Sequence, residues 1–239
     1  RERLPNKWDD ITVWYELLTW RTCVFKMLMD SNQSLSPDIK SALQQLGTQQ
    51  ETWTLLKLSE AARKQGLPMV CMNTLQRLQN PPHQSDAQHQ FIKLREEALC
   101  RLEMGSVQEM TAGLNTINKV NFDPANQQSF SQAHRAELLR IKGELLLRIP
   151  DSRQPHLTRV QEAGDVMTTS CAADDRSGKA WVTWGHVVNQ QLLYAEQKGG
   201  TSPAEVEKRN KLSEHAMNCY LQGVKHNCDR ARMLLSKVL

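Results

Sequence analysis

The sequence predicts an all-α fold, an α-solenoid of divergent tetratricopeptide- or HEAT-like helical hairpins with about ten helices. Apolar residues recur at spacings of three and four along nearly the whole chain. No β-strand alternation continues for more than a few residues, and Asn-Gly and Asp-Gly hairpin turns are absent. A mean hydropathy of −0.57 is polar for a compact globule, but it fits a repeat stack in which each repeat buries only one face.

Five apolar stripes predict helices in the first half of the chain. In order, they are Ile11, Trp14, Leu18, Phe25 and Leu28; Trp53, Leu56, Ala61 and Ala62; Val70, Leu75 and Leu78; Phe91, Leu94, Ala98 and Leu102; and Val107, Met110, Leu114 and Ile117. Gly66 and Gly105 are typical helix stops, and Pro68 suits a first helical turn. Pro81–Pro82 ends the third helix, and Ser106 with Glu109 predicts a capping box for the fifth.

Five more stripes follow after a predicted loop from Asn121 to Ser129. They are Phe130, Ala133, Leu138, Ile141, Leu145 and Ile149; Leu157, Val160, Ala163 and Met167; Ala180, Trp181, Trp184, Val187, Val188 and Leu192; Val206, Leu212, Ala216, Cys219, Tyr220 and Val224; and Ala231 with Leu234. Pro150 and Gly199–Gly200 mark helix ends, and Ser202–Pro203 with Glu205 predicts a second capping box.

Two glycines inside helical stripes favour stacked hairpins over a bundle. Gly143 lies between Leu139 and Leu146, and Gly185, 42 residues later, lies between Trp181 and Val188. Glycine inside a helix costs about 1 kcal/mol relative to alanine, so a close approach of a partner helix is a reasonable cause for it. Tetratricopeptide repeats use a related pattern with a usual period of about 34 residues, so these repeats are divergent.

The composition limits the cellular compartment and the classes of partner that we expect. No run of about 18 apolar residues and no signal sequence is present, so we expect an intracellular protein with no membrane span. The net charge of +4 is spread among acidic residues, which does not favour direct nucleic-acid binding. Scattered cysteines without a CxxC motif indicate reduced, packed thiols, and these are Cys23, Cys71, Cys100, Cys171, Cys219 and Cys228.

Candidate chemistry is sparse, and we expect no catalytic or cofactor-binding residues. The GxSxG, HExxH, Walker, HRD and DFG motifs are all missing. One possible zinc set consists of His215, Cys219, His226 and Cys228, because zinc accepts two histidines and two cysteines. However, the set matches no common zinc spacing, and Cys219 lies in an apolar stripe, so we predict no metal site.

Six tryptophans stand out among the aromatic residues: Trp8, Trp14, Trp20, Trp53, Trp181 and Trp184. Tryptophan often anchors protein interfaces, but most of these fall on predicted apolar faces, which favours core packing. Trp8 and Trp20 are the least explained by packing.

A collinear series of short blocks resembles the FAT region of the TRRAP family of PIKK pseudokinases, over nearly the whole chain. The blocks are Arg1 to Pro5 with Trp8 to Asp10, Trp14 and Thr19 to Arg21; Ala62 to Leu67; Phe91 and Lys93 to Arg95; Gly113 to Asn115 with Asn118 and Asn121; Ala136–Glu137 with Lys142–Gly143; Lys179 to Trp181 with Trp184–Gly185; and Cys219 to Gln222. The connections do not follow the family pattern, so we expect variable surface loops at Ser31–Gln50, Pro150–Pro155, Ala172–Ser177 and Gln197–Glu207.

The resemblance implies that residues 1–239 are an internal part of one FAT-type helical-repeat domain in a much larger nuclear protein. It implies a non-enzymatic scaffold that supports a C-terminal pseudokinase and docks transcription activators and subunits of a SAGA-type histone acetyltransferase complex. Two alternatives remain open, namely the FAT region of an active PIKK kinase and a tetratricopeptide adaptor that binds peptide tails. The second predicts a basic clamp built from successive repeats. We also expect a fragment cut from a solenoid to associate through its open apolar faces.

Overall fold

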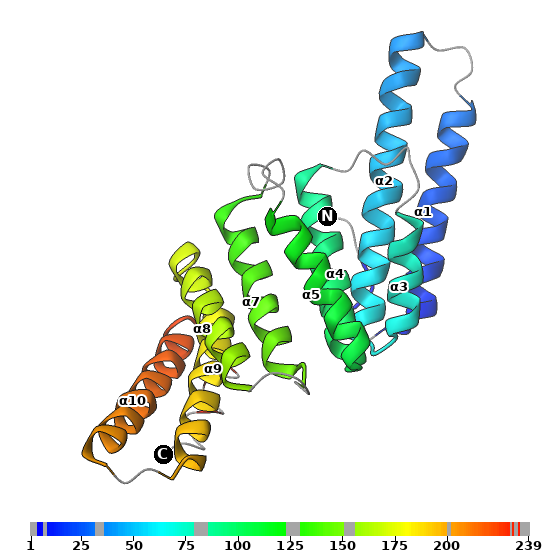
Figure 1. Cartoon of the computed structure of the whole chain (residues 1–239). Helices are drawn as coiled ribbons and strands as arrows, with labels where there is room; N and C mark the ends of the chain where they lie inside the picture. Colours follow the sequence, from blue (N-terminus) through cyan, green and yellow to red (C-terminus); the bar gives the residue numbers. More distant parts are fainter. Residues whose placement is uncertain are drawn as a thin grey trace. The chain divides into compact units, whose positions relative to one another are not determined.

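The computed structural model describes residues 4–6, 9–31, 36–78, 86–122, 130–150, 156–199, 202–229, 231 and 234. Every regular element within these residues is an α-helix, so the all-α prediction is confirmed (Figure 1). The helices are α1 (Ile11–Ser31), α2 (Pro37–Lys64), α3 (Pro68–Arg77), α4 (Ala87–Met104), α5 (Val107–Phe122), α7 (Gln132–Arg148), α8 (His156–Ala173), α9 (Gly178–Gln197) and α10 (Pro203–Lys225). Trp8, Pro81–Pro82, Gly200 and positions 123–129 of the predicted loop lie outside the described residues.

The chain divides into two compact units, Arg1–Gly105 with α1 to α4 and Ser106–Leu239 with α5 to α10. Within each unit, consecutive helices pack on one another, and α2 also contacts α4 as α7 contacts α9. We call α2, α4, α7 and α9 the A helices, and α1, α3, α5, α8 and α10 the B helices, whose main contacts inside a unit are with A helices. This pattern is that of a helical solenoid. That all 239 residues form one domain remains a prediction.

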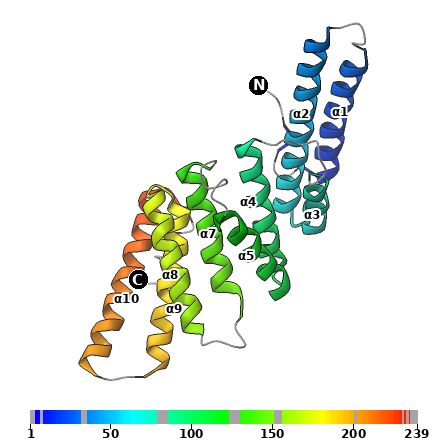
Figure 2. The same cartoon turned by 45° about the horizontal axis from the view of Figure 1, so that its top comes forward.

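Glycines let the hairpins of the second unit close tightly. A Cβ atom on Gly143 of α7 would lie 2.6 Å from Sδ of Met167 on α8, and one on Gly185 of α9 would lie 2.5 Å from Cε1 of Tyr220 on α10. Figure 2 shows α9 and α10 side by side as an antiparallel pair. The prediction that these two glycines admit a partner helix is therefore confirmed for both hairpins.

A buried carboxylate joins the helices of the first unit. Glu96 on α4 is fully buried and accepts hydrogen bonds from Arg63 Nε of α2 at 2.7 Å and from Arg95 Nη2 at 2.7 Å. Arg63 also donates to Glu103 at 2.6 Å. Next to this network lies an apolar cluster that holds α2, α3 and α4 together, made of Leu55, Leu56, Ala62, Cys71, Leu75, Leu78 and Cys100.

Helix ends largely follow the predicted signals. Gly66 and Gly105 have φ values of +72° and +74°, which glycine adopts without strain. Ser202 and Glu205 form the complete capping box at the start of α10. At α5, the Ser106 hydroxyl accepts a hydrogen bond from the backbone N–H of Glu109 at 3.2 Å, which is the first half of the predicted motif.

The expected loop at Ser31–Gln50 is wrong, because α2 already begins at Pro37. Ser36 precedes a proline at the first helical position, and Ile39, Leu43 and Leu46 continue at helical spacing. The pattern was hidden because much of this first part of α2 is exposed and rich in polar residues. Five residues of the predicted core stripes are also exposed, namely Leu28, Val70, Val107, Ala133 and Val206. The last four lie in first helical turns, where the partner helix provides little cover.

Candidate interaction surfaces

The four residues of the possible zinc set are not brought together. His215 is exposed and lies edge-on to Trp184 at 5.0 Å, whereas Cys219 is buried between helices. His226 caps the C-terminal end of α10, and Cys228 lies beyond it. Among the described residues, no group of three or more His, Cys, Asp or Glu side chains is placed to hold a metal ion.

Three of the buried thiols, those of Cys71, Cys171 and Cys219, are poor nucleophiles. Burial raises the pKa of Cys171 and of Cys219 to about 12, so both are protonated at neutral pH. In the first unit, the hydrogen bond with Cys100 and burial both raise the pKa of Cys71. Cys23 on α1 is exposed, but a reactive cysteine requires a charged or catalytic setting, and Cys23 lies beside Trp20 and Met27. No described helix is long and apolar enough to cross a membrane.

The tryptophans fall into two groups, while Trp8 lies outside the described residues. Trp14 is buried against α2, and Trp53, Trp181 and Trp184 are half-buried, as the packing interpretation predicted. Trp181 and Trp184 stack at 5.3 Å, and the Trp181 indole N–H donates to the Asp175 carbonyl at 2.7 Å. Trp20 is 72% exposed, so core packing does not account for it.

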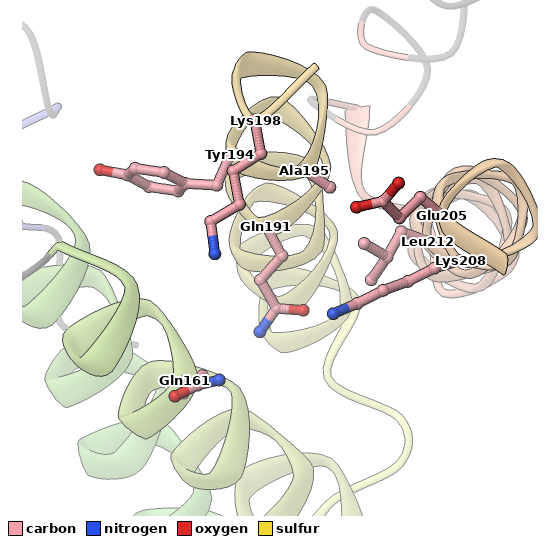
Figure 3. A pocket seen from close by; sticks show the side chains of 8 residues that line it. All are labelled: Gln161, Gln191, Tyr194, Ala195, Lys198, Glu205, Lys208 and Leu212. Carbon is pink, nitrogen blue, oxygen red and sulfur yellow. The ribbon is translucent and has the colours of Figure 1, made fainter. Parts of the chain in front are cut away.

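A pocket of about 290 Å³ opens on the second unit between α8 and α10, with α9 as its floor (Figure 3). Its lining residues are Gln161, Gln191, Tyr194, Ala195, Lys198, Glu205, Lys208 and Leu212. Figure 3 shows the Lys208 side chain extending toward Gln191, with Glu205 on the side of Ala195. Within the part of the chain that the structure describes, neither Lys198 nor Lys208 makes an ion pair.

The lining of this pocket carries groups that can bind an anion. Two ammonium groups and two carboxamides can hold a carboxylate, but Glu205 adds a negative charge beside them. Hydrogen bonds from the Ser202 hydroxyl and backbone N–H lower the pKa of Glu205, so this carboxylate is ionised at neutral pH.

A stripe of mostly exposed apolar residues runs along α1 in the first unit. It runs through Val13, Leu17, Trp20, Val24 and Met27, and we call these five residues the α1 seam. Four of them are exposed, including Met27 at 66%, and Val24 is half-buried. The seam was not predicted from the sequence, because the stripe through Trp14 and Leu18 already accounts for α1 as a helix. The alternating spacing of four and three residues was a signal that could have revealed it.

Comparisons with known proteins place the chain among transcription-associated proteins. The model of the FAT domain family matches residues 1–239. The chain is 28% identical over 249 residues to the SAGA complex/NuA4 acetyltransferase complex subunit TRA1 of Saccharomyces cerevisiae, which covers 100% of the chain and 6% of that protein. It is 26% identical over 268 residues to the probable transcription-associated protein 1 of Dictyostelium discoideum, covering 96% of the chain and 5% of that protein.

A mouse protein gives a similar match. The chain is 26% identical over 246 residues to the transformation/transcription domain-associated protein of Mus musculus, covering 100% of the chain and 8% of that protein. The chain thus spans between 5% and 8% of the length of these three relatives. The family model matches the whole length of the chain, its described residues form an all-α hairpin stack, and its relatives are transcription-associated proteins. The chain therefore belongs to the FAT domain family.

Proposed function

We propose that this chain is a non-enzymatic scaffold segment of a nuclear transcription coactivator subunit. In this role it supports a catalytically inactive kinase-like domain outside residues 1–239, and it docks transcription activators and subunits of a histone acetyltransferase complex. The observation that carries the proposal is the match, over the full length of the chain, to a protein named as a subunit of the SAGA and NuA4 acetyltransferase complexes.

The physical properties of the fold support a scaffold. Hairpins packed in sequence present extended surfaces and require no reactive groups. The conspicuous charged groups, such as Glu96 with Arg63 and Arg140 with Glu137 and Glu144, are paired within the fold and tie helices together or reinforce one helix. Such pairs fix geometry, which is what a supporting segment needs.

The test is purification of the tagged full-length protein from nuclear extract, with mass spectrometry of co-purifying proteins and an acetylation assay on histones. We expect histone acetylation and a stable set of coactivator subunits. A Gly185→Leu variant should lose part of this set, because the new side chain would collide with the Tyr220 ring. Ala172→Leu is the matched control, because Ala172 is exposed on α8.

The same experiment addresses the active PIKK kinase. ATP-dependent phosphorylation without coactivator subunits would contradict our proposal and favour a FAT region that supports a functional kinase. Unchanged recovery of every subunit with Gly185→Leu, at equal protein abundance, would show that this segment does not hold the assembly together.

A peptide-binding adaptor has weaker support. The pocket beside α9 contains two lysines, but both belong to the same hairpin, and α8 contributes a neutral Gln161. A clamp for acidic peptide tails needs cations from successive repeats. Lys198→Glu with Lys208→Glu should therefore leave the purified subunit set unchanged, and loss of a single subunit would revive the adaptor.

A further inference from the structure

The α1 seam is a second apolar face on a helix that already has a buried one. Trp14 and Leu18 pack against Leu58 and Ala61 of α2. The seam residues lie about 120° around the helix from this contact, since successive residues turn by about 100°. α1 therefore has the two faces that a helix needs when it packs between two neighbours, and only one of them is covered by the described residues.

The seam has the spacing of a helix-packing surface. Val13, Leu17, Trp20, Val24 and Met27 follow one another at intervals of four, three, four and three residues. This is the repeat that inserts side chains into the gaps of a facing helix. No charged residue occupies the seam itself. The hollow of about 480 Å³ beside it is lined mainly by apolar atoms, and its lining residues are Tyr15, Glu16, Thr19, Trp20, Cys23, Val24 and Met27.

Helices α3 and α8 are the described B helices that pack between two A helices. In α3 the exposed large apolar residues are Met69 and Val70, both in its first turn. Helix α8 packs between α7 and α9, with Val160, Ala163 and Met167 buried. None of its described large apolar residues is exposed. Helix α1 occupies the equivalent B position, but its main helix contact among the described residues is with the A helix that follows it, α2. The neighbour that α1 lacks is thus an A helix on its other side.

We propose that the α1 seam is covered by an amphipathic A helix of the same polypeptide, which directly precedes α1 outside residues 1–239. In both complete hairpins of the second unit, a B helix packs on the A helix just before it in sequence, as α8 does on α7 and α10 on α9. The relatives are many times longer than this chain, so a full-length protein of their size has polypeptide to supply that helix. The inference rests on the packing order and is independent of the proposed scaffold role.

The incoming helix has a defined chemistry. It must be about 20 residues long to run beside α1, which has 21 residues, and it must offer its own apolar stripe to the seam. A small residue opposite Trp20 would let the two helices approach, as Gly185 does beneath Tyr220 in the α9–α10 hairpin.

Oxidative footprinting of the purified full-length protein, free of other subunits, tests the proposal directly. Met27 is the reporter, and the same peptide in the urea-unfolded protein gives its unprotected rate. We expect Met27 to oxidise at least tenfold more slowly in the folded protein, approaching the rate of the fully buried Met167. A rate close to the unfolded value would overturn the proposal. Protection that arises only when partner subunits are added would overturn it as well, since a different protein would then cover the seam.

A matched pair of variants separates coverage from general stability. Leu17→Glu places a charge in the seam, and Lys26→Glu places one on the far side of the same helix. In the full-length protein, Leu17→Glu should restore rapid oxidation of Met27, while Lys26→Glu should leave it protected. Equal effects of the two variants would contradict a packed seam.

Discussion

Both units contain a glycine-closed hairpin, since Gly47 of α2 faces Met29 of α1, but the first unit adds a buried charge network. In the second unit, α9 and α10 meet where Gly185 leaves room for the ring of Tyr220, and α7 and α8 meet where Gly143 faces Met167. In the first unit, α2 and α4 are joined by the buried Glu96 carboxylate, which Arg63 and Arg95 neutralise. The first strategy depends on shape and the second on charge. The same fold can therefore be stabilised by interactions that respond to different perturbations.

The largest expected loss of stability is in the first unit, at the charge network around Glu96. Glu96→Ala leaves the partly buried guanidinium of Arg63 without its buried partner, which costs about 3 kcal/mol. Hydrogen exchange of the full-length protein, followed by mass spectrometry, should show faster exchange in α2 and α4. Glu103→Ala is the control, because Glu103 is exposed and its loss should cost less than about 1 kcal/mol. Equal losses of stability in the two variants would mean that the burial of Glu96 does not increase its contribution.

The next largest loss of stability is expected in the second unit, at Gly185. Gly185→Ala gains about 1 kcal/mol of helix propensity but forces the buried Tyr220 ring to move, for a net loss of about 2 kcal/mol. Gly143→Ala should be nearly neutral, because the flexible Met167 side chain can move aside. Exchange rates in α9–α10 and α7–α8 measure both changes. A larger loss at position 143 than at 185 would reverse this ranking.

A smaller change is expected at the start of α10. Ser202→Ala removes the hydroxyl that accepts the Glu205 N–H at 3.3 Å and should cost about 1 kcal/mol. Hydrogen exchange in the first turn of α10 should become faster, whereas hydrogen exchange in α7 should not change. Ser202→Asp should preserve the cap, and failure of that variant to do so would point away from capping.

The smallest effect depends on pH. Burial alone would raise the pKa of Glu60, but hydrogen bonds and charge from Lys64 and Lys57 lower it from 4.5 to about 2. The stability that ionised Glu60 adds to the folded state is thus present above pH 4.5 and is lost as the pH falls toward 2. Because both lysines are partly exposed, we expect about 0.5 kcal/mol. Glu60→Gln should flatten the acid dependence of α2 exchange in this range, and an unchanged curve would contradict the ion pairs.

Most of the fold could be predicted from the sequence because helical periodicity, capping boxes and glycine stops act locally. Gly143 and Gly185 even indicated where partner helices would approach. The charge network around Glu96 could not be predicted, since Glu96 and Arg63 are far apart in sequence and nothing local marks Glu96 as buried. Similarly, the α1 seam was overlooked because its residues look like ordinary helix surface until the neighbouring helices are placed. The pocket beside α9 depends on three helices at once, which the periodicity of one segment does not encode.

The sequential packing of A and B helices also has a mechanical consequence. Because each helix touches only its near neighbours within a unit, bending strain can be shared among many small interfaces instead of opening one central core. Such a stack behaves as an elastic element that yields slightly at every hairpin. A large assembly built on it could change the spacing of its attached parts at low energetic cost while every hairpin remains folded.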